Sequence, residues 1–219
     1  MMLLREVDID APELPREQRA SFRFSVRSLA ALFQRTIAAS KLKADGWKVL
    51  VDFVREPKRS DVLLTSGVYV VQMGVDIAAL DALAPRERNL RVLEALARGF
   101  DEVARQQGWP SELGAAARQA VLDLDFRNVW TLGKPSTSPD GKYRAELRCE
   151  HLPSAFHAHL VVHDRKGHEL RRKLAVDALP DEMIFGLSLG KVAWVSPTRV
   201  RLTAKNGSEV AALDLAEDS

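Results

Sequence analysis

The chain has 219 residues, of which 46% are hydrophobic and 28% are charged. This length and composition allow a buried core and exclude a chain that is disordered throughout. The 32 basic and 30 acidic residues give a net charge of only +2, so the chain lacks the basic excess that is typical of a dedicated nucleic-acid binder.

The N-terminus and the single cysteine predict a cytoplasmic protein. Met1–Leu4 is followed at once by Arg5 and Glu6, which leaves no apolar run of about 7–15 residues for a secretory signal. No segment approaches the roughly 18 apolar residues of a transmembrane helix, so we expect no membrane partner. Cys149 is the only cysteine, so an intramolecular disulfide is excluded and a reducing compartment is favoured.

The first third of the chain predicts one helix and a pair of strands after an extended lead-in over residues 1–15. Apolar residues recur at positions 22, 26, 29, 33 and 37, which is the spacing of one helical face. Residues 47–54 and 62–75 are rich in β-branched and aromatic residues, and Ser66-Gly67 interrupts the second run. We expect these strands to form an antiparallel pair.

Two helices follow, over residues 85–107 and from residue 111 onward. Leu90, Leu93, Ala97, Phe100 and Ala104 form one apolar stripe. Proline opens the first helix and glycine follows it, as is usual at helix ends. The short connection at residues 108–110 predicts a helical hairpin.

The pattern changes after residue 132. Residues 133–141 contain two prolines and two glycines and predict a linker or turn. From residue 142 to 219 the apolar residues alternate in short runs between turn-forming residues, as in an antiparallel β-meander. The predicted fold is therefore α+β: N-terminal helices with a β-hairpin over 1–132, the linker 133–141 and the meander 142–219, with one domain or two left open. The predicted core face of the meander is Tyr143, Ala145, Leu147, Phe156, Ala158, Leu160, Val162, Leu170 and Leu174.

All five histidines lie within 18 residues of one another, between positions 151 and 168. His157, His159 and His163 share the polar face of one predicted strand, because side chains alternate along a strand. We interpret this face, with Arg144, Glu146 and Arg148 of the preceding strand, as a solvated or partner-binding surface. The alternative is a metal site in which His157, His159 and His163 bind zinc or another divalent transition metal.

No catalytic residue is predicted. The chain contains no Gly-x-Ser-x-Gly elbow, no Walker loop and no Gly-x-Gly-x-x-Gly fingerprint. A basic stripe near the first helix (Arg23, Arg27, Arg35, Lys41 and Lys43) is a candidate nucleic-acid surface, but such stripes are usually solvated helix faces.

These observations favour a non-enzymatic protein that binds another protein and needs no cofactor. The abundance of Ala, Arg and Leu is typical of a GC-rich bacterial genome, in which a small protein without motifs could be an immunity or inhibitor protein for a cognate toxin. The alternative is a metal-binding protein or metal-dependent enzyme that uses the histidine face. The oligomeric state is not predicted.

Overall fold

The computed structural model describes residues 1–216, apart from the side chain of Met183. It confirms the α+β class, with helices and antiparallel sheets. The chain divides into two compact units, Met1–Arg127 and Asn128–Ser219, here called the N-terminal and C-terminal units. Each unit has hydrophobic clusters of its own, and each is described by itself.

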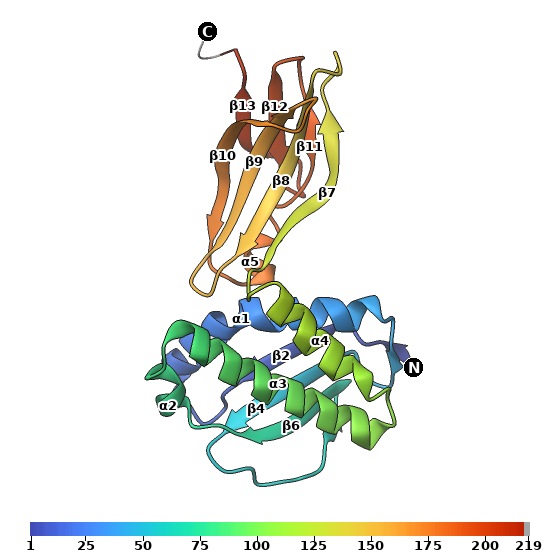
Figure 1. Cartoon of the computed structure of the whole chain (residues 1–219), viewed down its shortest axis with the longest axis vertical. Helices are drawn as coiled ribbons and strands as arrows, with labels where there is room; N and C mark the ends of the chain where they lie inside the picture. The colour runs from blue at the N-terminus through green and yellow to red at the C-terminus, as the bar shows by residue number, and fades with distance from the viewer. Residues whose placement is uncertain (217–219) are drawn as a thin grey trace. The chain divides into compact units, whose positions relative to one another are not determined.

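The N-terminal unit contains a four-stranded mixed sheet in the order β2-β4-β6-β5 (Figure 1). The strands are β2 (Glu6–Asp10), β4 (Lys48–Val54), β5 (Leu63–Thr65) and β6 (Val68–Gly74). β2, β4 and β6 are parallel, and β5 is antiparallel to β6. Two short strands, β1 (Met2–Leu3) and β3 (Lys43–Ala44), pair separately.

Two predictions for this sheet are wrong. The strands over 47–54 and 62–75 are not an antiparallel pair, because β4 is parallel to β6. Ser66 and Gly67 both have positive φ (50° and 78°) and form a tight turn, so β5 folds back on β6 instead. Residues 1–15 are not only a lead-in, because they contain β2. The sequence did not predict β2, because acidic residues alternate with its apolar ones. Val7 and Ile9 of this strand are fully buried.

Four helices accompany this sheet: α1 (Arg16–Ala39), α2 (Ile77–Asp81), α3 (Pro85–Gln107) and α4 (Glu112–Asp123). The predicted α3–α4 hairpin is confirmed, with Gly108 in the left-handed conformation (φ 66°) at the end of α3. α3 packs directly on β4 and β6. A Cβ on Gly99 would lie 2.6 Å from Val51 Cγ1, so this close approach requires glycine. No helix in the described part of the chain is long and apolar enough to cross a membrane.

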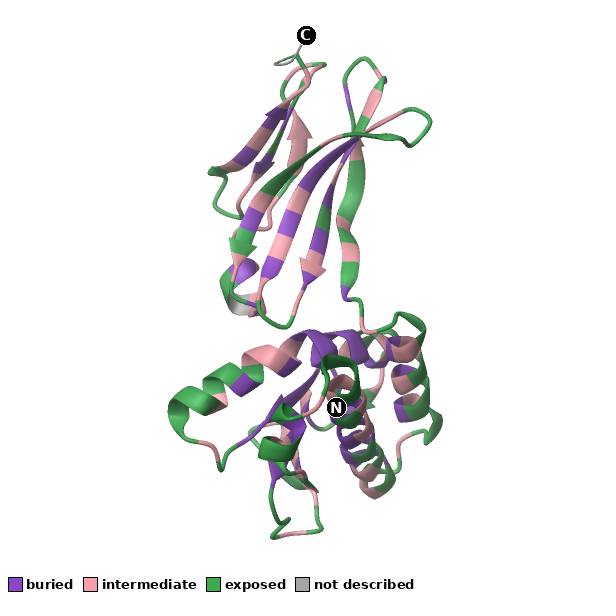
Figure 2. Ribbon diagram, turned by 60° about the vertical axis from the view of Figure 1, so that its left-hand side comes forward, coloured by how far each residue is buried: buried purple, intermediate pink, exposed green. Residues whose placement is uncertain are grey.

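The C-terminal unit is built from two antiparallel sheets. The first has the order β10-β9-β8-β7 and contains β7 (Val129–Thr137), β8 (Tyr143–His151), β9 (Phe156–Asp164) and β10 (Glu169–Ala178). The second contains β11 (Val192–Trp194), β12 (Arg199–Thr203) and β13 (Glu209–Asp214). A short helix, α5 (Glu182–Phe185), lies between β10 and β11 in the chain. Side chains of both sheets share one interior, where Leu147 clusters with Leu202 and Ala145 with Leu213. Buried and more accessible residues alternate along β8 and β9 (Figure 2).

The structure differs from the sequence prediction at two places in this unit. Residues 133–137, predicted as linker, belong to β7. Gly133 (φ 71°) and Pro135 lie where the β7–β8 register shifts, between Leu132 and Ser136, so turn-forming residues occupy a bulge inside a strand. Leu170 and Leu174, predicted as core, are each 47% exposed. Register shifts between Glu169 and Arg171 and between Leu174 and Val176 break the alternation of β10.

Candidate functional site

The candidate site is the face of the β7–β10 sheet that points away from β11–β13, here called the outer face. Its residues are set by strand register, because paired residues project to the same side of a sheet. Four rows cross β8, β9 and β10 in that order: Arg144–His163–Glu169, Glu146–Val161–Arg172, Arg148–His159–Leu174 and Glu150–His157–Asp177. The six residues singled out from the sequence (Arg144, Glu146, Arg148, His157, His159 and His163) therefore lie on this one face.

Several charges of the outer face are paired with one another. His163 Nε2 lies 3.4 Å from Glu146 Oε1, and His157 Nε2 lies 3.4 Å from Asp177 Oδ1. Arg172 donates two hydrogen bonds to Glu169, from Nε at 2.9 Å and from Nη2 at 2.8 Å.

Arg144 and Arg148 are exposed and form no ion pair with any residue that the structure describes. Their guanidinium groups are therefore free to bind a carboxylate from outside the chain.

His159 occupies the centre of the face, between Arg148 and Leu174. Burial lowers the pKa of His159, and the nearby charges of Arg172 and His157 lower it further. The imidazole is therefore neutral at neutral pH, and its ring can both donate and accept a hydrogen bond.

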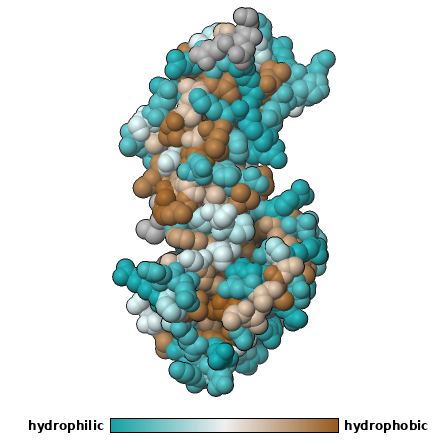
Figure 3. All heavy atoms as spheres, turned by 90° about the vertical axis from the view of Figure 1, so that its left-hand side faces the viewer, coloured by the Kyte–Doolittle hydropathy of each residue, from teal (hydrophilic) through white to brown (hydrophobic). Residues whose placement is uncertain are grey.

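Apolar surface accompanies these polar groups. Leu174 is 47% exposed beside His159, and Val129 of β7 is 37% exposed at the edge of the sheet. In contrast, Val161 is fully buried in the same face. Figure 3 shows the β10 side of the C-terminal unit, where brown, apolar atoms are also prominent among the teal ones. The face thus combines free cations with exposed aliphatic side chains, as interface surfaces do.

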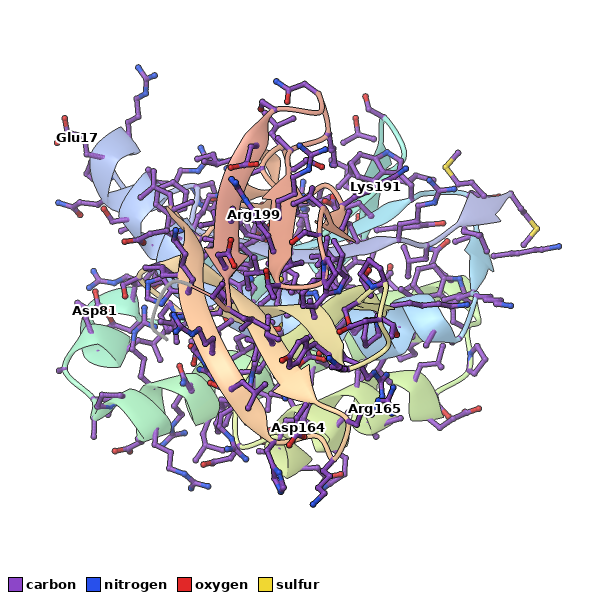
Figure 4. The ribbon with its side chains drawn as sticks, turned by 90° about the horizontal axis from the view of Figure 1, so that it is seen from above. Glu17, Asp81, Asp164, Arg165, Lys191 and Arg199 are labelled. Carbon is purple, nitrogen blue, oxygen red and sulfur yellow. The ribbon has the colours of Figure 1, made fainter. Side chains whose placement is uncertain are left out.

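One end of the outer face is hollowed beside the β9–β10 turn. The hollow measures about 250 Å³ and is lined by Arg144, Glu146 and His163 with turn residues that include Asp164 and Arg165. Arg165 donates a 2.7 Å hydrogen bond from Nε to the carbonyl oxygen of Gly141, and both labelled turn residues are visible in Figure 4. The side chain of Arg165 therefore connects the β9–β10 turn to the β7–β8 turn.

The geometry does not assemble the metal site considered from the sequence. The described residues contain no group of three or more His, Cys, Asp and Glu side chains placed to hold a metal ion. The rings of His157 and His159 are 6.3 Å apart, while His157 and His163 contact carboxylates. Cys149 is fully buried in the interior, as its place in the alternation predicts.

The two remaining histidines lie elsewhere. His151 is buried, with Nε2 at 3.2 Å from the carbonyl oxygen of Pro180 and its ring against Phe185. His168 is in the β9–β10 turn and contacts Asp164 at 3.1 Å. Neither belongs to the outer face.

Sequence reasoning missed the contribution of β10 to this face. The sequence pattern places Leu174 in the core and assigns no role on this face to Glu169, Arg172 and Asp177. The signal that could have revealed them is the run Arg171-Arg172-Lys173, which is incompatible with simple alternation of apolar and polar residues and therefore suggests a bulged edge strand.

No model of a known family, no curated protein and no solved structure matches this chain. The functional argument therefore depends on the geometry of the chain itself.

Proposed function

We propose that this chain is a non-enzymatic protein-binding module and that the outer face of the C-terminal unit is its binding surface. The observation that carries the proposal is the central row Arg148–His159–Leu174. It places an unpaired guanidinium, a neutral imidazole and a half-exposed leucine side by side on three paired strands. Arginine and apolar side chains at the centre of a patch are typical of protein interfaces.

The shape of the surface favours a protein over a small molecule. Small-molecule sites are concave and usually enclose about 300–1,000 Å³. The hollow on the outer face measures about 250 Å³ and opens at one end of the face, away from the central row. A partner with an extended surface could contact the hollow and the central row together.

The chemistry of the face indicates what the partner presents. Arg144 and Arg148 of β8 would bind carboxylates, and Leu174 of β10, across His159 from Arg148, would contact an apolar side chain. The proposed partner is therefore a protein that presents acidic side chains next to an apolar contact.

A narrower form of the proposal is that the chain is an immunity or inhibitor protein that neutralises a cognate toxin in the bacterial cytoplasm. Its support is the GC-rich composition and the absence of catalytic motifs, which is an argument from the class of protein. Co-expression with the product of the adjacent gene tests it: protection from a toxic product supports this form, and growth arrest despite co-expression contradicts it.

The general proposal is tested by site-specific photo-crosslinking in the source cell. A photoreactive residue at position 148 should capture one protein, which then binds the purified chain. The matched control is position 201 on β12, where another exposed arginine lies on the second sheet. The proposal fails if both positions capture the same proteins or if the captured protein does not bind in purified form.

A further inference from the structure

A second surface lies in the N-terminal unit, where the loop between β4 and β5 borders a hollow of about 660 Å³. The other walls are the last residues of β6 and one side of α3. Val51 pairs with Val71 and Phe53 with Met73 in the parallel β4–β6 ladder, so the hollow lies at the carboxyl end of these strands. Ligands of open sheets with parallel strands bind outside this end.

The loop that forms the wall is held in place by two glutamines. Gln72 Oε1 of β6 accepts a 2.8 Å hydrogen bond from the backbone N–H of Lys58. Gln106 of α3 donates to the carbonyl oxygen of Ser60 at 3.0 Å and accepts from the N–H of Val62 at 2.9 Å. The wall is therefore formed before any ligand arrives, and binding needs little ordering of the loop.

Three cations face this hollow: Lys58, Arg59 and Arg98. None of them forms an ion pair with a residue described by the structure. Glu102 also lines the hollow, but Arg105 donates hydrogen bonds to its carboxylate at 3.0 and 2.5 Å. These bonds and one from Gln106 lower the pKa of Glu102 to about 2. Its charge is thus matched by Arg105, and the hollow keeps an excess of positive charge.

Arg59 adds an independent indication. Its Nε is buried and has no hydrogen-bond partner among the described residues. The charge of Arg59 acts on Asp52, but the two side chains form no ion pair within the described chain. A buried donor without an acceptor is unfavourable, and the residue that carries it lines the hollow.

We propose that this hollow binds a small phosphorylated molecule. Its phosphate would lie among the guanidinium groups of Arg59 and Arg98 and the ammonium group of Lys58, because arginine forks match phosphate oxygens in pairs. The rest of the ligand would pack on Pro57, Val71 and Met73, which form the apolar part of the wall. The volume is in the usual range of about 300–1,000 Å³ for such sites. This site is in the other unit and does not depend on the proposed protein-binding face.

The test is an NMR titration of the full chain with inorganic phosphate and, separately, with phenyl phosphate at the same pH. Both probes should cause saturable shifts of the amides of residues 58–60 and 72. Phenyl phosphate should bind more tightly, since its ring adds apolar contact. Arg98→Gln should weaken both probes about tenfold, the equivalent of one lost charge-assisted hydrogen bond.

Arg91→Gln is the matched control, because Arg91 is exposed on the same helix two turns earlier, and it should leave both affinities unchanged. Lys58→Gln provides a second variant if Arg98→Gln does not fold. The proposal is overturned if neither probe saturates, or if the variants at positions 98 and 91 behave alike. Equal affinity for the two probes would overturn the assignment of an organic ligand.

Discussion

Charged side chains are arranged differently in the two units. In the N-terminal unit, Asp8 of β2 is only 3% exposed and is surrounded by cations. Arg27 Nη1 and Lys48 Nζ each lie 2.9 Å from one of its carboxylate oxygens. In the C-terminal unit, the charges of the outer face are more exposed, their contacts are longer or at the surface, and Arg144 and Arg148 have no ion pair among described residues.

This difference separates charges that stabilise the fold from charges that are available for binding. Burial raises the pKa of Asp8, but the charges of Arg27 and Lys48 outweigh it, so the pKa lies below its usual value. Removing one member of such a buried group leaves uncompensated charge and is costly. Exposed ion pairs contribute about 0–1 kcal/mol, so the ion pairs of the outer face can be broken at little cost in stability.

The largest predicted effect is that of Asp8→Ala. The substitution leaves Arg27 and Lys48 without the buried carboxylate and with longer contacts to Glu6, at 3.7 and 3.3 Å, and it should lower the free energy of unfolding by about 3–5 kcal/mol. Chemical denaturation measures this change. Glu56→Ala is the control, because Glu56 is exposed in the β4–β5 loop, and it should change stability by less than about 0.5 kcal/mol. Similar losses for both variants would contradict the assigned role of Asp8.

A smaller effect, of opposite sign, is expected at Asp52 of β4. Burial and the neighbouring charge of Asp10 raise the pKa of Asp52 from 3.8 to about 6. The folded protein therefore holds this proton more tightly than the unfolded chain, and stability falls as pH rises from about 4 to about 6.

Asp52→Asn removes this penalty. Since Asp52 is only partly buried, water screens some of the repulsion, and the expected gain is about 1 kcal/mol at about pH 8. The gain should vanish near pH 4, where Asp52 is protonated in the folded state. Denaturation at both pH values measures it, and a gain that does not depend on pH would contradict the explanation.

A still smaller effect is expected for the Arg172–Glu169 pair on the outer face. Both side chains are more than one-third exposed, at 40% and 38%. Glu169→Gln should therefore change the free energy of unfolding by less than about 0.5 kcal/mol. A loss comparable to that of Asp8→Ala would mean that the ion pairs of the outer face stabilise the C-terminal unit as much as the buried charges stabilise the N-terminal unit. This result would contradict the comparison of the two units.

The smallest effect concerns the protonation of His159. Its NMR titration midpoint should lie below 6.5, the ordinary pKa of histidine. Burial and the charges of Arg172, His157 and Arg148 lower the pKa of His159. Glu150 acts in the opposite direction. Arg172→Gln should raise the midpoint, because it removes one of the charges that lower the pKa of His159. A midpoint above 6.5 would contradict the described environment of His159.

Local patterns were sufficient to predict the long elements. α3 was predicted with its bounds, because its apolar stripe, Pro85 and Gly108 all lie within one segment. The interior face of β8 and β9 was predicted correctly from strict alternation, and Ala145, Leu147, Leu160 and Val162 are buried. In these segments, neighbouring residues determine both the element and the face that it buries.

Long-range contacts explain what the sequence did not reveal. The parallel pairing of β4 with β6 depends on the turn at Ser66-Gly67 and on α3, not on either strand alone. The basic stripe near the first helix is predicted to be a solvated face, but its Arg23 and Arg27 contact Asp8 of β2, a strand that the sequence did not predict. A bulge in β7 places turn-forming residues inside a strand, and bulges in β10 leave apolar residues exposed that the pattern predicts to be buried.

The central claim is that the outer face binds another protein, and the most direct measurement is the affinity of the captured partner for two charge-reversed variants. Arg148→Glu should weaken binding at least about tenfold, because it replaces a cation that faces partner carboxylates with a like charge. Arg201→Glu, on the second sheet, should leave the affinity unchanged, and both variants should melt like the unmodified protein. Equal affinities for the two variants would contradict the claim.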